Sequence, residues 1–237
     1  MSAVREQFYQ DRECLVTALS DELAAVLEKA IADRGEACLL VSGGSTPKPV
    51  YRALASRPLD WSKVTVALVD ERWVDADHPA SNEQFIRENL LIEGAAAAKF
   101  VAMKTSAATA VLGLPECLAR YGALPLQPDL CVLGMGLDGH TASLFPHASG
   151  LDSGLAAGAD RCVAITAQQS EVTGPHTERM TLSVAAILAC RHIVLLITGD
   201  EKLAVYRQAL SGPDAREMPV RAVLRQSQTP VSVYWSP

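Results

Sequence analysis

The stretch with the most specific chemistry is VLGMGLDGHTASLFP, residues 132 to 146. Three glycines within six residues surround an acid and a histidine, Asp138 and His140, directly after an apolar run. A short helix is predicted to begin at Thr141 and to be limited by Pro146. Because a helix dipole disfavours the imidazolium form at its N-terminus, His140 would stay neutral near pH 7, as a general base requires. The pattern predicts a catalytic histidine, and a structural histidine is the alternative.

A second candidate is VSGGSTPKPVY, residues 41 to 51. Gly43 and Gly44 permit a tight turn that brings bare backbone N–H groups close to a ligand. Ser45 follows, Thr46 is predicted to cap a helix, and Pro47 suits the first helical position. Free N–H donors at the positive end of a helix dipole favour an anion such as phosphate. A plain strand-to-helix turn is the alternative, since neither a Walker P-loop nor G-x-G-x-x-G is present.

Two further loops carry charge where apolar runs end. Asp70, Glu71 and Arg72 follow one such run, and they form either a functional cluster or a solvated surface triplet. Lys202 lies three residues after Gly199, in the first turn of a predicted helix. A lysine there opposes the helix dipole, and a bound anion would offset that cost. Lys202 is therefore interpreted as a ligand contact.

The elements that must position these residues alternate along the chain. Short continuous apolar runs, typical of strands buried on both faces, occur at 37–41, 64–69, 130–133, 162–165, 193–197 and 231–235. Helical spacing or helix-start signals occur at 15–34, 47–55, 81–91, 114–120 and 202–210, and the third of these opens with a Ser81/Gln84 capping pair. The alternation predicts one α/β domain over residues 1–237, a doubly wound, mostly parallel sheet with helices on both faces.

This architecture makes a spatial prediction. All four charged or glycine-rich loops follow strand-like runs, and the carboxyl ends of parallel strands lie at one edge of a sheet. We therefore expect His140 and Lys202, far apart in the sequence, to face the same pocket.

Composition limits the function classes. The net charge of −6 and the pI of about 5.4 argue against a basic nucleic-acid surface, but they permit a small anionic ligand held by a few cations. None of the six cysteines forms a C-x-x-C pair, so we expect buried thiols and no metal cluster. The first fourteen residues lack the apolar segment of a signal peptide. We expect a cytoplasmic protein, a monomer or weak homo-oligomer, that binds neither nucleic acid nor membranes.

The motifs together resemble those of the 6-phosphogluconolactonase family, which is related to the glucosamine-6-phosphate deaminases. The matching stretches, in the expected order from about residue 38 to 206, are Ser42–Pro47, Asp70–Arg72 with Ser81 and Asn82, Gly134–Pro146, Arg179–Leu182 and Gly199–Lys202. The glycine-rich histidine motif is the most specific of these, and the Ser-Gly-Gly motif is shared with the deaminases.

The resemblance implies a Rossmann-like fold and hydrolysis of 6-phospho-D-glucono-1,5-lactone without a metal or organic cofactor. It implies that His140 is the general base, with Asp138 as its neighbour. The implied phosphate and substrate contacts are Gly43, Gly44, Ser45, Thr46, Asp70, Arg72, Arg179 and Lys202. Arg179 could equally form an ion pair, and Asp70, Glu71 and Asp138 all remain candidates to orient His140.

Two alternatives remain. An amino-sugar-phosphate isomerase or deaminase needs a carboxylate base, and such relatives carry Glu-Pro shortly after the histidine, where this chain has Phe145 and Pro146. A non-catalytic sugar-phosphate sensor would join the fold to a DNA-binding segment, for which the first fourteen residues are too short. An assay with phosphogluconolactone and glucosamine 6-phosphate separates these hypotheses.

Overall fold

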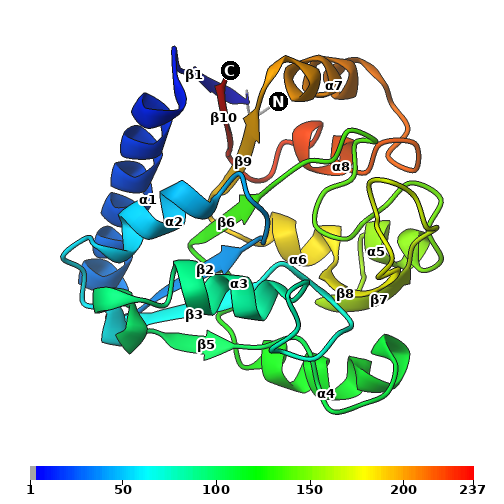
Figure 1. The fold of residues 1–237 in the computed structure, drawn as a ribbon, viewed down its shortest axis with the longest axis horizontal. Helices are drawn as coiled ribbons and strands as arrows, with labels where there is room; N and C mark the ends of the chain where they lie inside the picture. The colour runs from blue at the N-terminus through cyan, green and yellow to red at the C-terminus, as the bar shows by residue number, and fades with distance from the viewer. Residues whose placement is uncertain (1–3) are drawn as a thin grey trace.

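The computed structural model describes residues 4–237, so the predicted single domain extends three residues beyond the described part. A seven-stranded parallel sheet forms its centre, in the order β1-β10-β9-β6-β2-β3-β5 (Figure 1). Its strands are β1 (Arg5–Phe8), β2 (Ala37–Val41), β3 (Val64–Leu68), β5 (Lys99–Val101), β6 (Leu130–Leu133), β9 (Ile193–Thr198) and β10 (Val231–Ser236). β2, β6 and β9, adjacent in the middle, consist mostly of buried apolar residues. The predicted α/β class is confirmed.

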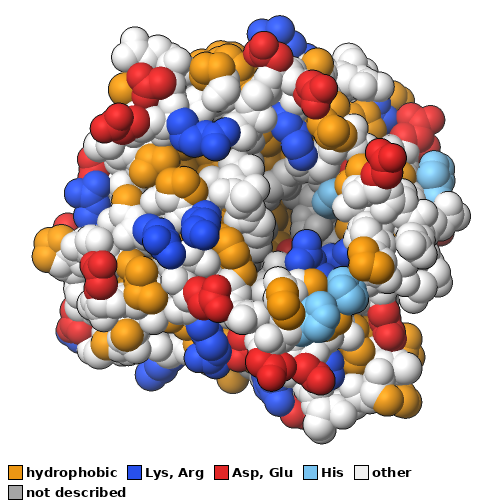
Figure 2. Space-filling view, viewed as in Figure 1, with side chains coloured by type: hydrophobic (Ala, Val, Ile, Leu, Met, Phe, Trp, Pro, Cys, Tyr) orange, Lys and Arg blue, Asp and Glu red, His pale blue; other side chains and the backbone are white. Residues whose placement is uncertain are grey.

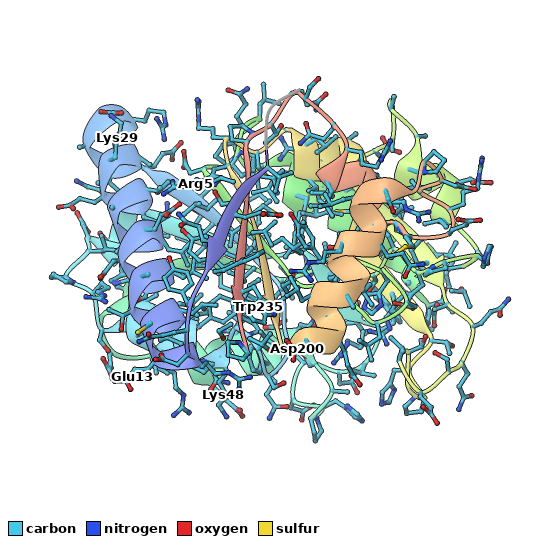
Figure 3. All side chains as sticks on the ribbon, turned by 90° about the horizontal axis from the view of Figure 1, so that it is seen from above. Arg5, Glu13, Lys29, Lys48, Asp200 and Trp235 are labelled. Atoms are coloured by element: carbon cyan, nitrogen blue, oxygen red, sulfur yellow. The ribbon has the colours of Figure 1, made fainter. Side chains whose placement is uncertain are left out.

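Helices cover both faces of this sheet, as predicted. They are α1 (Arg12–Arg34), α2 (Lys48–Ala55), α3 (Asn82–Asn89), α4 (Ala110–Gly122), α5 (Leu151–Leu155), α6 (Val184–Leu188), α7 (Asp200–Ser211) and α8 (Arg221–Leu224), with 3₁₀ turns at Trp61–Lys63 and Glu93–Ala97. Figure 3 shows α1 and α7 on opposite sides of the strands. Lys48 and Asp200, the first residues of α2 and α7, lie at the same end of the molecule in that view.

A second, three-stranded antiparallel sheet was not predicted. It contains β4 (Asp70–Arg72), β8 (Glu178–Leu182) and β7 (Cys162–Thr166), in that order. The chain passes from one sheet to the other at Val69, whose N–H donates to Val41 O and whose O accepts from the Leu182 N–H. The apolar run at 162–165 is a strand as predicted, but it belongs to this small sheet. Asp70–Arg72 is a strand itself.

Two helix starts differ from the prediction. No side chain caps α2, and Pro47 precedes its first residue, so the expected cap by Thr46 is wrong. No helix follows His140: residues 141–145 form turns with one isolated Thr141–Leu144 bridge. Left-handed backbone at Gly139 (φ 77°) and Ala142 (φ 51°) explains this, because an α-helix cannot contain it. Ser81 does cap α3, accepting from the Gln84 N–H at 3.2 Å.

Five of the six cysteines are buried free thiols, as expected, but Cys14 is exposed in the first turn of α1. Among residues 4–237, no helix is long and apolar enough to cross a membrane.

Candidate active site

The loops at the carboxyl ends of β2, β6 and β9, together with β4 and β8, enclose one cavity of about 510 Å³. His140 and Lys202 both line it, as the strand pattern predicted. Figure 2 shows a hollow near the middle of this face, with Lys, Arg and His side chains around it. The predicted contacts that line the cavity are Gly43, Gly44, Ser45, Thr46, Asp70, Arg72, Arg179 and Lys202. Asp138 lies behind His140.

His140 is held by Asp138. Asp138 Oδ1 lies 2.6 Å from His140 Nδ1 and accepts the His140 backbone N–H at 3.0 Å. Burial opposes ionisation of Asp138, but the hydrogen bonds and charge of His140 outweigh it and lower the pKa of the carboxyl. Because an ionised carboxylate only accepts, Nδ1 carries a proton. Nε2 of the neutral ring is then an acceptor to which no side chain or backbone group of residues 4–237 donates. Among the three candidate carboxylates, Asp138 is the one in hydrogen-bond contact with the histidine.

The predicted reason for a neutral His140, a helix dipole, is wrong because no helix begins there. The loop is instead a tight glycine turn, in which Gly136 N–H donates to His140 O at 2.9 Å. A Cβ on Gly136 would lie 2.0 Å from His140 Nδ1, so only glycine permits this approach. The imidazole also packs against Phe145, with ring centroids 4.2 Å apart.

Two arginines form one wall of the cavity. Arg72 on β4 lies directly opposite Arg179 on β8, and like charges in such a cross-strand pair repel. The wall is anchored by backbone carbonyls: Arg72 Nη1 donates to Ala80 O at 2.6 Å, and Arg179 donates to His176 O at 2.7 Å and Thr173 O at 2.8 Å. Burial and the charge of Arg72 lower the pKa of Arg179. A bound anion would offset both the repulsion between the two arginines and the unfavourable burial of the Arg179 charge.

The predicted ion-pair alternative for Arg179 is wrong within residues 4–237. No described carboxylate lies within 4.0 Å of the guanidinium of Arg72 or Arg179, or of the Lys202 ammonium. Three cations thus line one cavity with no partner of opposite charge in the described chain. This arrangement favours an anionic ligand.

Lys202 approaches the cavity from the first turn of α7 and donates to the carbonyl of Met135, in the same loop as His140. Its ammonium is half-buried, and burial lowers its pKa, opposed by the nearby charge of Asp138. The lysine therefore connects the cationic part of the cavity with the histidine loop.

The glycine turn after β2 supplies backbone donors. Among the hydrogen bonds of residues 4–237, none is donated by the N–H groups of residues 43–46. Gly44 has a φ of 107°, which an L side chain rarely adopts. All four residues line the cavity next to the start of α2, a location that suits anion binding.

Asp70 lines the cavity as a buried carboxylate. Ser143 Oγ donates to its Oδ2 at 2.6 Å, and Asn82 Nδ2 donates to its backbone carbonyl at 2.8 Å. Both bonds come from segments distant in the sequence, so the orientation of Asp70 is fixed by tertiary structure. Its other oxygen, Oδ1, lies 3.5 Å from Asn82 Nδ2, the long end of hydrogen-bond range, so it retains acceptor capacity for a ligand hydroxyl.

Sequence reasoning missed three parts of the cavity wall. Asn82 was part of a matched motif but was not assigned a role, although its place after the Ser81 cap indicated a helix start at the strand ends. Phe145 was noted only for the missing Glu-Pro pair. Glu171 and Val172 come from a loop without periodicity, in which no signal was present.

Replacing Gly43 with alanine is expected to destabilise the fold by about 1–3 kcal/mol, because a Cβ would lie 2.0 Å from the Oδ1 of buried Asn82. Urea unfolding measures the change. Gly122→Ala is the control, because nothing lies within 4 Å of its Cβ position and it should be neutral or slightly stabilising. Equal stability of the two variants would contradict the close packing at Gly43.

Comparison with known proteins agrees with this geometry. Residues 10–235 match the family model described as glucosamine-6-phosphate isomerases/6-phosphogluconolactonase. A 6-phosphogluconolactonase of Rhizobium meliloti (strain 1021) is 43% identical over 229 residues, covering 97% of both chains. One from Pseudomonas putida is 40% identical, covering 100% of this chain and 94% of the relative.

Solved structures give the same picture. The crystal structure of a 6-phosphogluconolactonase from Shewanella baltica OS155 matches with a TM-score of 0.93 and 43% identity, covering 99% of this chain and 98% of that one. The family match spans residues 10–235, a range that includes the whole cavity lining, and the chain therefore belongs to the glucosamine-6-phosphate isomerase/6-phosphogluconolactonase family.

Proposed function

We propose that this chain hydrolyses 6-phospho-D-glucono-1,5-lactone to 6-phospho-D-gluconate, a step of the oxidative pentose phosphate pathway, with water activated by His140. One observation carries the proposal: a carboxylate-held histidine shares a single cavity with three cations that have no carboxylate within 4.0 Å in the described part of the chain. The names of the relatives support the same substrate.

A lactone is an activated ester, so its hydrolysis needs a nucleophilic water and stabilisation of the developing negative charge. His140 Nε2 accepts a proton from water as the water oxygen bonds to C1 of the lactone. Asp138 stabilises the resulting imidazolium. The C1–O bond to the ring oxygen then breaks, and the imidazolium returns the proton to that oxygen. The new carboxylic acid ionises, so each turnover releases one proton.

The phosphate supplies binding energy remote from the reacting carbon. We assign it to Arg72, Arg179, Lys202 and the N–H groups of residues 43–46, and the sugar hydroxyls to Asp70. Holding the phosphate at one wall positions the carbonyl against the water at His140, which lowers the entropic part of the barrier.

The test of this function is proton release from freshly made phosphogluconolactone, at slightly acidic pH to suppress spontaneous opening. Glucosamine 6-phosphate is the parallel substrate, with ammonia release as its readout. Enzyme-dependent acid release with no ammonia supports the lactonase. Ammonia release without acid release would assign the chain to the deaminases. If neither acid nor ammonia is released, the hypothesis of a non-catalytic sugar-phosphate sensor remains.

Replacing Lys202 with alanine is expected to raise KM for the phosphorylated lactone by about 10- to 100-fold, the worth of one charge-assisted hydrogen bond. KM for unphosphorylated gluconolactone should change little. Lys48→Ala is the matched control. Lys48 is an exposed lysine at the start of α2, close to the turn at residues 43–46, but it does not line the cavity. Equal effects of Lys202→Ala on both lactones would remove Lys202 from the phosphate site.

The single domain, the cytoplasmic location, the monomeric or weakly oligomeric state and the absence of nucleic-acid binding stay predictions. Size-exclusion chromatography at several concentrations tests the oligomeric state.

A further inference from the structure

Glu71 is a fully buried carboxylate beside the cavity that does not line it. Its two oxygens accept four hydrogen bonds, which fill the acceptor capacity of a carboxylate. The donors are Arg72 N at 2.8 Å and Asn82 N at 2.7 Å on Oε1, and Glu83 N at 2.8 Å and Ser81 Oγ at 3.0 Å on Oε2. Three of the four come from the start of α3, so Glu71 fixes that helix start to β4.

The segment that Glu71 holds, residues 80–83, reaches the cavity at three places. The carbonyl of Ala80 accepts from the guanidinium of Arg72 at 2.6 Å. The side chain of Asn82 donates to the Asp70 carbonyl at 2.8 Å. Asn82 also packs directly on the backbone of Gly43, in the glycine turn after β2. The positions of Arg72, Asp70 and the glycine turn at Gly43 thus all depend on this segment.

We propose that Glu71 is a positioning residue that sets Arg72, Asp70 and the Gly43 turn for the phosphorylated substrate by holding residues 80–83 in place. The inference rests on the proposed function, because it assigns those three groups to the substrate. Glu71 acts through them and does not touch the ligand.

This role requires the ionised carboxylate. A protonated carboxyl carries an O–H that donates, and it then loses one of its four acceptor positions. Burial raises the pKa of Glu71 to about 7, and the donated hydrogen bonds oppose a larger rise. The charged and titratable groups around Glu71 are Asp70 and Arg72 on β4, Arg179 on β8, Glu83 on α3 and Tyr121 on α4. Substrate binding and deprotonation of Glu71 should therefore favour each other.

The first experiment compares Glu71→Gln with Glu88→Gln. Both remove one carboxylate, but Glu88 is exposed on α3, accepts from Gln84 Nε2 at 3.1 Å and does not line the cavity. We expect Glu71→Gln to lower kcat/KM for phosphogluconolactone by about 10- to 100-fold, chiefly through KM, because misplaced contacts weaken positioning. Glu88→Gln should match the wild type. A folded Glu71→Gln with wild-type KM would overturn the proposal.

The second experiment uses only the wild type and decides the question if Glu71→Gln does not fold. The pH titration of the Asn82 and Glu83 amide resonances is recorded by NMR with and without 6-phosphogluconate. The ligand should move the midpoint to lower pH by about one unit, equivalent to tenfold tighter binding to the ionised form. An unmoved midpoint would overturn the proposal.

Failure of the proposed function gives a different result. In that case the wild type neither hydrolyses phosphogluconolactone nor binds 6-phosphogluconate, and the inference falls with it. If the wild type is active and both Glu71 measurements are unchanged, the positioning role alone is wrong.

Discussion

Replacing His140 with alanine is expected to lower kcat for phosphogluconolactone hydrolysis by about 10²- to 10⁴-fold, the usual contribution of a general base. The loss follows from geometry: among the cavity-lining side chains, only this imidazole presents a free basic nitrogen held by a carboxylate. Binding of 6-phosphogluconate should be nearly unchanged, because the proposed phosphate contacts lie on other elements. Proton-release assays give kcat for the lactone, and calorimetry gives Kd for 6-phosphogluconate.

The control for this variant is His147→Ala, which makes the same change at an exposed histidine outside the cavity wall. It should retain full activity. Normal turnover by His140→Ala would refute the general-base role, whereas loss of product binding would mean that the histidine is needed for the shape of the site.

Replacing Asp138 with asparagine is expected to lower kcat by about 10²- to 10⁴-fold, as in other histidine–carboxylate pairs. The amide occupies the same volume but cannot stabilise the imidazolium by charge. Its NH₂ group can also donate to Nδ1, which would place the ring proton on Nε2 and block proton acceptance from water. KM should change much less than kcat, since Asp138 does not line the cavity.

Asp152→Asn is the matched control, because Asp152 forms an exposed ion pair with Arg216 away from the cavity. Its activity should equal that of the wild type. Activity of Asp138→Asn within a few-fold of the wild type would mean that the 2.6 Å contact with His140 is structural.

The sequence predicted that the site residues lie together, because loops at the carboxyl ends of parallel strands share one edge of the sheet. Continuous apolar runs such as Ala37–Val41 and Ile193–Thr198 are buried on both faces, which favours a parallel sheet. In such a sheet, loops that follow strands share an edge whatever their distance in sequence. His140 and Lys202 therefore face one cavity.

The details that were wrong depend on interactions that a local pattern does not contain. Cys162–Thr166 has the apolar character of a central strand, but its partner is β8, and only the whole fold determines that pairing. The missing helix after His140 follows from left-handed backbone at Gly139 and Ala142. Glycine adopts this conformation readily, but alanine rarely does and is a good helix former. The residue types at 141–145 therefore indicated a helix, which the observed backbone does not form.

The role of Glu71 shows the same limit. In the sequence, Glu71 is one member of a triplet of charged residues, for which a solvated surface remained an alternative to a functional cluster. Its four hydrogen bonds arise because β4 meets the start of α3, eleven residues further along the chain. Because the contact between β4 and the start of α3 is buried, Glu71 lies inside the protein next to the cavity and not on the surface.

The most direct test of the central claim is a crystal structure with 6-phosphogluconate bound. We predict that the phosphate contacts Arg72, Arg179, Lys202 and the turn at residues 43–46, with the C1 carboxylate within hydrogen-bond reach of His140 Nε2, about 2.6–3.2 Å. A phosphate bound elsewhere, or a carboxylate directed away from His140, would contradict the account.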